Sequence, residues 1–370
     1  MPNRRSVLKI LGGGFILAAG STGAFFGTRT PTRALAPWKV AGDYDDPRMR
    51  ALSYAILAPN PHNRQPWIVD LKVEDQVAIW RDKEKNLPET DPFDRQLTIG
   101  MGCFLEQMTI AASETGHSVA FDLFPQGENG PVAIARFSAR KTADNNDRPD
   151  RLAAHMQARR SCKKPFEEKI PQATPELAAL ADILIDPSQV EELRKLTWDA
   201  WMIEATTHRT MKESTDLFRL GKAEIEANPD GIDFSGPFFE SLILAGLMTR
   251  EGSLDPSSME FAEGAKIYNE MLFKTPAYAV IKTPANDRLA QIEAGRRWLR
   301  LNLTTTALGL SLHPVSQALQ EYPEMSDTYA KLHIMLAKPG ETVQMLGRLG
   351  YGPTVPQSPR WPLEAKLMNA

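Results

Sequence analysis

Three stretches of the sequence carry polar side chains at spacings that could bind a ligand. The first, residues 58–67, reads A-P-N-P-H-N-R-Q-P-W. Its three prolines restrict the backbone, while Asn60, Asn63 and Gln65 offer amide donors and acceptors that could hold a planar heterocycle by fixed hydrogen bonds. A turn at the end of a helix, with its amides capping the backbone, is the alternative interpretation.

The second and third stretches could bind an anion. Residues 158–166 read A-R-R-S-C-K-K-P-F, in which Arg159, Ser161 and Lys163 alternate. In an extended segment these side chains would project to one side and surround a phosphate. Residues 347–363 run from a β-rich segment into a proline-rich tail, and either Arg348 or Arg360 could serve the same phosphate. A solvated basic turn and a tail that only wraps the surface are the alternatives.

The composition excludes several other classes of protein. Lys plus Arg total 43 against 46 for Asp plus Glu, so the formal charge is -3, too balanced for the basic surface that nucleic-acid binding requires. Two cysteines and six scattered histidines offer neither a disulfide framework nor the paired spacing of a zinc site. The 42% of hydrophobic residues suffices for one or two sizeable cores.

The amino terminus predicts a targeting segment. Residues 3–9 read N-R-R-S-V-L-K, and residues 10–27 contain no charge. The Arg4-Arg5 pair resembles a twin-arginine export signal, with Val7 where phenylalanine is usual. A transmembrane anchor is the alternative, since eighteen such residues lie at the short limit for crossing a bilayer. Either interpretation places the rest of the chain outside the cytoplasm, in the periplasm or an equivalent compartment.

Whether this segment is removed is left open. The residues at 34–36 read A-L-A, a small-x-small pattern suited to a signal peptidase, but Pro37 should hinder cleavage. A protein anchored in the membrane through an uncleaved signal is therefore the other possibility. The glycines at 12–14 lie inside the signal and follow no strand, so they do not form a phosphate loop.

The periodicity of the remaining chain predicts the elements that must position these stretches. A helix over 46–57 should end just before the first stretch, and a hairpin should follow it. We expect further helices starting at Gly102 and Gly295 and over 151–159, 174–185 and 189–206. Strands are expected over 67–73, 76–80, 119–124, 132–137, 279–283 and 343–351. Short strand groups alternating with helices indicate an α+β fold.

The sequence also shows signs of internal doubling. Residues 102–116 and 295–309 are helical runs with glycines fourteen apart, and their apolar positions coincide, as at Met108 and Leu301. Both runs look like a buried helix closed by a C-terminal glycine. A polar linker over 141–151 places a boundary between a first half, 37–150, and a second half, 151–370. Residues 207–273 have no counterpart in the first half.

Together the three stretches carry a family resemblance. The first is similar to the A-P-S-x-x-N-x-Q-P-W signature of the FMN-dependent nitroreductase superfamily, the second resembles that family's phosphate-binding opening, and the third resembles its closing segment. Here the first stretch lies in the first half and the other two in the second half. This order resembles the tandem-domain Acg-type branch, in which one chain with two fused half-domains imitates the family dimer and keeps one flavin site.

The resemblance implies a nitroreductase-like α+β fold with one FMN. By similarity, the phosphate would be bound by Arg159, Ser161, Lys163 and Arg360, with Arg160 adjacent. The flavin ring and ribityl chain would be contacted by Pro59, Asn60, Pro61 and Asn63. After the Gly295 helix, backbone groups would face the edge of the ring that becomes negative on reduction; they belong to Leu312, His313, Pro314, Val315 and Ser316. His313 is expected to be structural rather than catalytic, and residues 207–273 resemble a lid over the flavin.

The function implied is an exported oxidoreductase that passes two electrons from a donor to a nitroaromatic, quinone or similar planar acceptor. Because reduced nicotinamides are cytoplasmic, the donor outside the cytoplasm need not be NAD(P)H. A flavin-sequestering protein without turnover is the first alternative, and a membrane-tethered interaction protein with a decayed site is the second. The expected partners are a small-molecule donor and acceptor and the twin-arginine export machinery. With the dimer built into one chain, a monomer is expected.

Overall fold

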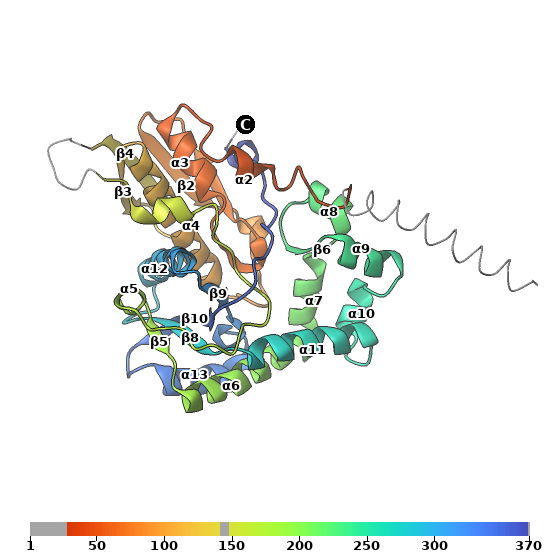
Figure 1. Cartoon of the computed structure of the whole chain (residues 1–370). Coiled ribbons are helices and arrows are strands. Elements are labelled where there is room, and N and C mark those ends of the chain that lie inside the picture. The colour runs from red at the N-terminus through yellow and green to blue at the C-terminus, as the bar shows by residue number, and fades with distance from the viewer. Residues whose placement is uncertain (1–27, 141–147, 369–370) are drawn as a thin grey trace, which may run out of the picture.

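The computed structural model describes residues 28–140 and 148–368, and in that part of the chain the α+β class is confirmed (Figure 1). The export signal predicted at the amino terminus lies almost wholly outside these residues. Within them, no helix is long and apolar enough to cross a membrane. Residues 28–36 are described, and they pack on the body of the molecule, with Ala34 only 3% exposed.

Two antiparallel four-stranded sheets form the framework, one in each half of the chain. The first has the order β1-β2-β4-β3, with β1 Trp67–Asp70, β2 Gln76–Arg81, β4 Ala133–Ala139 and β3 His117–Leu123. The second has the order β5-β8-β10-β9, with β5 Asp182–Leu184, β8 Ala277–Thr283, β10 Thr342–Gly350 and β9 Ser311–Pro314. In chain order both sheets read first, second, fourth, third. The doubling expected from the sequence is therefore present in the topology of the sheets.

Two long helices lie between the sheets and cross each other (Figure 1). They are α4 (Arg95–Glu114) and α12 (Arg288–Ala307). The sequence predicts helices that start at Gly102 and Gly295. In the structure both glycines instead lie within the helices, where the two backbones touch. A Cβ on Gly102 would stand 2.2 Å from the carbonyl oxygen of Ile292, and one on Gly295 would stand 2.0 Å from that of Ile99. The contact is reciprocal, as a two-fold relation between the halves requires.

The C-terminal glycines of these runs have the conformation that the sequence predicts. Gly116 and Gly309 follow α4 and α12 with φ of +71° and +69°, in the left-handed region where a side chain is strained. Each lets the chain turn directly into the next strand, β3 or β9.

The apolar residues divide into two cores because β8 is buried on both faces. Ala277, Ala279 and Ile281 face the central core, which contains α4, α12 and the inner face of the first sheet. Tyr278 and Val280 alternate with them and face a second core beneath α6 (Pro187–Thr206) and α13 (Ser326–Leu336). The central core takes residues from both halves, so the halves share one interior.

The remaining helices cap the sheets or precede the site. They are α2 Ala36–Val40, α3 Pro47–Ala55 and α5 Pro175–Ala178, and short 3-10 turns lie at Pro61–Asn63, Lys83–Lys85, Arg151–His155, Gln317–Leu319, Pro323–Met325 and Leu363–Lys366. Two of the helix predictions are largely wrong. The run over 174–185 is one helical turn followed by strand β5, and the run over 151–159 is a 3-10 turn. Residues 312–316, expected to present backbone groups to a flavin, begin in strand β9.

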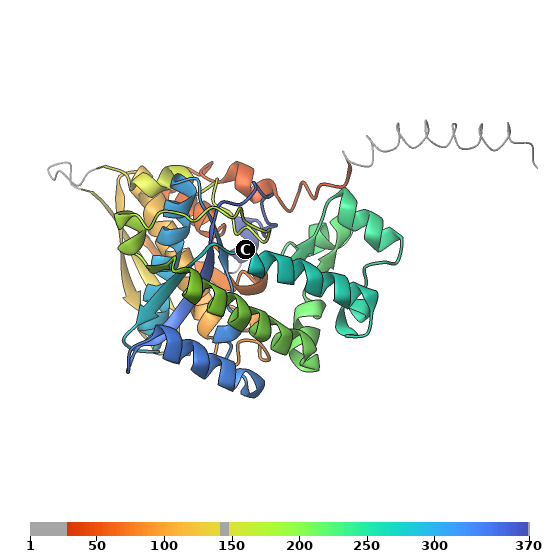
Figure 2. The ribbon, with the colours of Figure 1, turned by 60° about the horizontal axis from the view of Figure 1, so that its bottom comes forward.

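The stretch without a counterpart in the first half forms a separate layer at the end of the molecule (Figures 1 and 2). We refer to residues 207–273 as the excursion. It contains α7 His208–Asp216, α8 Gly221–Ala227, α9 Pro237–Leu244, α10 Arg250–Leu254, α11 Met259–Phe273, and the parallel pair β6 Phe218–Leu220 and β7 Ile232–Phe234. No other described strands pair in parallel within a sheet.

The C-terminal tail connects the second half to the first. After β10 ends at Gly350, the chain crosses to the first sheet, where the backbone N–H of Met368 donates to the carbonyl of Val69 in β1 at 2.8 Å. This path carries Arg360 from the second half onto the loop that follows α3.

Candidate functional site

The first of the three stretches is a strained loop after α3. His62, Asn63 and Gln65 have φ of 46°, 51° and 50°, and a non-glycine residue in the left-handed region costs about 1–3 kcal/mol. Side-chain hydrogen bonds hold this shape. Asn60 Oδ1 accepts from the N–H of Gln65 at 2.7 Å, and Gln65 Oε1 accepts from the N–H of Trp361 at 2.9 Å. The loop is thereby fixed against the C-terminal tail.

The side-chain amides of this loop donate to backbone carbonyls and do not point into an open site. Asn60 Nδ2 donates to the carbonyl of Ala58, Asn63 Nδ2 to that of Pro359 and Gln65 Nε2 to that of Pro229. For these side chains the alternative interpretation, amides that cap the backbone, describes the structure. Pro59 and Pro61 flank Asn60 and end the helical path of α3.

Two buried arginines converge on the end of α3. Arg159 Nη2 donates to the carbonyl of Leu57 at 3.0 Å. Arg360 Nε donates to the carbonyl of Ile56 at 2.9 Å, and its Nη2 to those of Leu57 and Ala58. A helix C-terminus presents unpaired carbonyls and a partial negative charge, which explains why guanidinium groups dock there. Arg360 Nη1 also reaches Asn63 Oδ1 at 2.7 Å.

A third arginine joins them over an aromatic ring. The Arg160 guanidinium lies 5.0 Å from the centre of the Trp38 ring and that of Arg360 lies 5.6 Å from it. Trp38 is buried in α2 and donates its indole N–H to the carbonyl of Ser358 at 2.8 Å. No sequence motif marks Trp38, because only the tertiary path of the chain brings α2 beside the tail.

The arginine cluster, Arg159, Arg160 and Arg360, brings three positive charges close together. Among the residues that the structure describes, none of the three forms an ion pair with a carboxylate. Burial lowers the pKa of Arg159 to about 10 and that of Arg360 to about 9, and in each case a neighbouring arginine adds to the effect. All three stay charged at neutral pH. The Nε atoms of Arg159 and Arg160 are buried without a partner, so the cluster suits an anionic ligand.

Ser161 and Lys163 continue along the second stretch. Within the described ranges, 28–140 and 148–368, neither side chain forms a hydrogen bond or an ion pair. The Lys163 side chain is open to solvent, yet enough protein surrounds it to lower its pKa, with Asp233 and Glu204 opposing that shift.

His313 and Arg348 form a buried pair beside Lys163. Arg348 Nη1 lies 3.3 Å from His313 Nδ1, and Arg348 Nε donates to Thr275 Oγ1 at 2.8 Å. Because a guanidinium only donates, Nδ1 must accept, which leaves the His313 proton on Nε2. Burial, then Arg348 and Lys163, hold the pKa of His313 well below its ordinary value. His313 is thus a neutral donor. Arg348 forms a hydrogen bond with His313 and does not belong to the arginine cluster.

The backbone around His313 is partly committed to the sheet. The N–H of Val315 donates to the carbonyl of Leu346 at 2.9 Å, and the carbonyl of Leu312 accepts from Cys162. Pro314 has no N–H. Backbone N–H groups of this segment were expected to face a ligand. The N–H of Val315 is instead bonded within the protein, and Ser316 follows the end of β9.

The excursion contributes acidic groups that the sequence analysis did not single out. Asp233 in β7 is close enough to Lys163 and Arg360 for both cations to lower its pKa, although burial outweighs them and raises it. The excursion is tied to the loop, since the N–H of Gly231 donates to the carbonyl of Asn63. Asp230 pairs with Lys85 at 2.8 Å and with Arg219 at 2.6 Å. No sequence motif marks Asp233.

His62, at the tip of the loop, is a second neutral histidine. Burial, then Lys163 and Arg64, lower its pKa to about 4. Its Nδ1 atom is buried without a partner. Lys163 lowers the pKa of both His62 and His313, which indicates that the three side chains lie in the same region.

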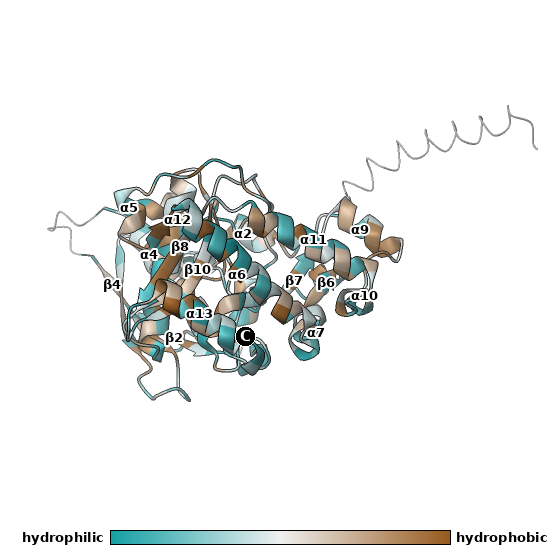
Figure 3. Ribbon diagram, turned by 90° about the horizontal axis from the view of Figure 1, so that it is seen from below, coloured by the Kyte–Doolittle hydropathy of each residue, from teal (hydrophilic) through white to brown (hydrophobic). Residues whose placement is uncertain are grey.

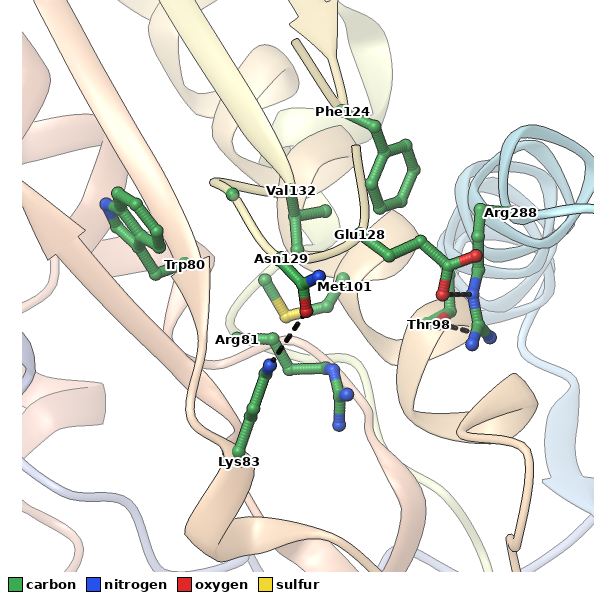
Figure 4. A pocket seen from close by; sticks show the side chains of 11 residues that line it. Trp80, Arg81, Lys83, Thr98, Met101, Phe124, Glu128, Asn129, Val132 and Arg288 are labelled. Carbon is green, nitrogen blue, oxygen red and sulfur yellow. Dashed lines mark hydrogen bonds and ion pairs between the residues drawn. The ribbon is translucent and has the colours of Figure 1, made fainter. Parts of the chain in front are cut away.

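Two hollows in the described part of the chain have different characters. One of about 50 Å³ lies between β2 and the start of α4, where Lys83 contacts Asn129 and Arg288 contacts Glu128 and Thr98 (Figure 4). Its lysine and Arg288 already have partners. The other, of about 220 Å³, lies beside Arg360 and is lined mainly by apolar residues, among them Pro37, Val40, Ile56 and Trp361.

Comparison with known proteins gives a consistent result. No family model matches the chain. It is 25% identical over 324 residues to "Putative NAD(P)H nitroreductase Rv3131" of Mycobacterium tuberculosis, covering 84% of this chain and 87% of that protein. It is 31% identical over 119 residues to "Putative NAD(P)H nitroreductase acg" of the same organism, covering 32% and 35%. Over most of its length the chain is similar to proteins that carry the name nitroreductase.

Solved structures resemble this chain more remotely. The FMN-dependent nitroreductase NfnB from Mycobacterium smegmatis, solved with NADPH, has 17% identity and a TM-score of 0.36 over 56% of this chain and 92% of its own. A nitroreductase from Bacteroides fragilis, solved with bound FMN, has 13% identity and a TM-score of 0.32 over 55% of this chain and 89% of its own.

Proposed function

We propose that this chain is an FMN-dependent oxidoreductase with a nitroreductase-like fold, built from two fused halves that share one flavin site. The observation that carries the proposal is the arginine cluster, Arg159, Arg160 and Arg360, which is buried or half-buried and has no carboxylate partner among the described residues. The similarity to the two mycobacterial proteins named as NAD(P)H nitroreductases supports it.

The residues present fit the phosphate of FMN. A phosphate monoester carries close to two negative charges at neutral pH and three acceptor oxygens. Arg159 and Arg160 each have a buried Nε without a partner, and the Ser161 hydroxyl makes no hydrogen bond within the described residues. Charge-assisted bonds to these donors would relieve the repulsion among the guanidinium groups.

The remaining contacts of the proposed site lie at its two sides. The loop at 59–63 comes from the first half, and Lys163 with His313 comes from the second. When bound, FMN would supply the two-electron chemistry, which needs no side-chain nucleophile. Lys163 and the neutral His313, with its proton on Nε2, would offer donors to negative charge on the ring, and the strained loop would fix the ring position.

The reaction we propose passes two electrons from a donor to a nitroaromatic, quinone or similar planar acceptor. The names of the mycobacterial relatives favour NAD(P)H as the donor, whereas export through the twin-arginine route would favour a different reductant outside the cytoplasm. We propose that export, and a monomeric state, on the basis of the Arg4-Arg5 segment and of the two sheets within one chain.

The test is the flavin content of an Arg159→Gln, Arg360→Gln double variant of the full chain. The native protein should release about one FMN per chain on denaturation, identified by chromatography and by its visible spectrum, and the double variant should release little. Arg297→Gln is the matched control. Like Arg159, Arg297 donates to backbone carbonyls, those of Leu180 and Lys282, but it lies outside the cluster.

Flavin that stays stoichiometric in the double variant would overturn the site assignment. Native protein that binds no flavin even with excess FMN would overturn the function. If flavin is present, rapid reoxidation of the reduced protein by a nitroaromatic distinguishes an enzyme from a flavin-sequestering protein.

A further inference from the structure

The excursion exposes an apolar face that no described residue covers. In and just after α9, the side chains of Phe238, Leu244 and Leu247 are 68%, 71% and 55% exposed. Phe239, Leu242, Ile243 and Met248 beside them are only partly buried. We call Phe238, Leu244 and Leu247 the α9 face. Figure 3 shows α9 as one of the most hydrophobic segments at the outer end of the molecule. Large apolar side chains that gather in an exposed state on one short segment indicate an interaction surface.

The α9 face is part of a packed structure rather than a frayed end. Phe238 packs edge-on against Phe239 with ring centres 5.3 Å apart, and Phe239 packs in the same way against Phe234 in β7. Phe234 in turn contacts Phe218 in β6 at 4.8 Å. The aromatic chain connects the exposed side chain to the parallel strand pair and holds α9 in place.

The face carries no exposed charge. Residues 237–248 read P-F-F-E-S-L-I-L-A-G-L-M, so Glu240 is their one ionisable residue. It is 6% exposed, accepts from the backbone N–H of Lys222 and lies 3.6 Å from the guanidinium of Arg29. An uncharged apolar surface fits hydrocarbon better than it fits a polar or charged protein partner.

The described chain begins beside this face. Thr28 accepts a hydrogen bond from Lys222 of α8 through its carbonyl at 2.9 Å, and Arg29 pairs with Glu240 of α9. Figures 1 and 2 show the start of the described chain next to α8 and α9. The residues before it, 10–27, contain no charged side chain. The apolar leader and the apolar face are therefore joined by a short connection.

The connection is built into the fold. Ala34 is buried, and its carbonyl accepts from the backbone N–H of Arg360 at 2.8 Å. Pro37 and Trp38, directly after the A-L-A pattern, are buried as well. A peptidase needs an accessible, extended substrate, so cleavage after Ala36 is obstructed once the chain has folded.

We propose that residues 10–27 remain attached as a lipid-embedded segment and that the α9 face rests on the same bilayer. A patch of three side chains alone would bind a membrane weakly, but a tethered segment raises its effective concentration at the surface. The proposal does not depend on flavin binding, so either can fail without the other.

The test measures where the α9 face lies in the full chain on vesicles. Cys103 and Cys162 are buried, so an introduced cysteine can be labelled selectively with an environment-sensitive fluorophore. Leu244→Cys carries the label, and the protein is reconstituted into phosphatidylcholine vesicles with or without lipids that bear a quencher on the acyl chain. Ile334→Cys in α13 is the matched control, because this apolar side chain is 84% exposed on a different part of the fold.

The label at position 244 should lose most of its emission to the lipid quencher, and the label at position 334 should keep it. A Leu247→Asp substitution in the Leu244→Cys background should restore the emission at 244. Equal quenching at both positions, or none at 244 while the protein floats with the vesicles, would overturn the docking. A protein that does not float would overturn the retained leader. Emission at 244 that is already blue-shifted without lipid would show that the leader or a second copy covers the face, which also contradicts the proposal.

Discussion

At the residue scale, the arginine cluster differs from Arg95 and Arg219 in having no carboxylate partner among the described residues. Arg95 is paired with Glu321 at 3.1 Å, and Arg219 with Asp230 at 2.6 Å. Arg159 and Arg360, equally buried, donate to backbone carbonyls. Arg360 also donates to the side-chain oxygens of Asn63 and Ser358, which carry no charge. Repulsion among the three guanidinium groups lowers the stability of the fold, and a bound anion would offset this repulsion. The cluster therefore suits an anionic ligand. His62 and His313 stay neutral for a different reason, chiefly because they are buried and secondarily because other cations lie near them.

His62 should make the protein sensitive to mild acid. The unfolded chain takes up a proton on His62 near pH 6.5, whereas the folded chain resists until about pH 4. Between these values the unfolded state binds more protons, so the free energy of unfolding should fall as the pH is lowered from 6.5 to 4. His62→Asn keeps a residue that tolerates the left-handed φ but removes the titration.

Denaturant unfolding at pH 7 and pH 4.5 measures this effect. The native protein should lose more stability between the two pH values than His62→Asn does. His313, whose pKa is also lowered, remains in the variant, so its own loss should be reduced rather than abolished. Equal losses would show that His62 takes up its proton without a cost to folding.

At the element scale, the crossing of α4 and α12 depends on two glycines. The reciprocal contacts of Gly102 with Ile292 and of Gly295 with Ile99 bring the two backbones together. No flexible side chain lies at these points that could move aside, because the neighbouring atoms belong to the backbone. The distance between the halves, and so the position of the loop relative to Lys163 and His313, is set by these two positions.

Gly102→Ala should therefore destabilise the protein by at least about 1–3 kcal/mol, the usual cost of overpacking. Gly264→Ala in α11 is the control, since a Cβ there would meet no atom within 4 Å. It should instead stabilise the protein by about 0.5–1 kcal/mol, because alanine is the better helix former. Denaturation midpoints measure both, and a neutral Gly102→Ala variant would contradict the close approach.

The elements that the sequence predicted are those with local signals. The hairpin of β1 and β2, the helix α6 and the glycine ends of α4 and α12 all follow from alternation, helical periodicity or a turn residue. Strand β5 was missed because its three residues are strand only through pairing with β8, as in Asp182 with Val280. A contact so distant in sequence leaves no periodic trace.

The same division holds in the site. Arg159, Arg360 and Asn63 were predicted from their motifs, and the structure brings them together on the end of α3. Trp38 and Asp233 were missed, because each reaches the site through a tertiary path that no motif announces. The amide side chains of the loop were assigned to ring contact, whereas here they maintain the backbone shape.

At the scale of the whole molecule, the two halves behave as one body. The central core draws residues from both, and Glu106 of α4 bridges Arg296 and Arg300 of α12 at 2.6 and 2.5 Å. The C-terminal tail adds a second connection by pairing with β1. A shared interior of this kind favours a single cooperative unfolding transition.

Cutting the chain between the halves should leave them together. A protease site inserted within residues 141–147, followed by cleavage, should give two fragments that co-elute on size exclusion in native buffer and separate only in denaturant. The flavin content should also survive cleavage. The same site inserted between Ala262 and Glu263 of α11 is the control, since it interrupts a packed helix. Fragments that separate in native buffer would show that the shared core is too weak to hold the halves.

The reciprocal glycine contact has a consequence for how such a chain can change over generations. In a symmetric dimer every substitution occurs twice, once in each copy, so a change that improves one site must be tolerated at its mirror position. In this chain each half is encoded separately, and Arg159 or the excursion can exist on one side alone. Gly102 and Gly295 are the exception. Each faces the backbone of the opposite helix, which no substitution elsewhere can remove, so the same restriction to glycine acts at both positions although each could change separately.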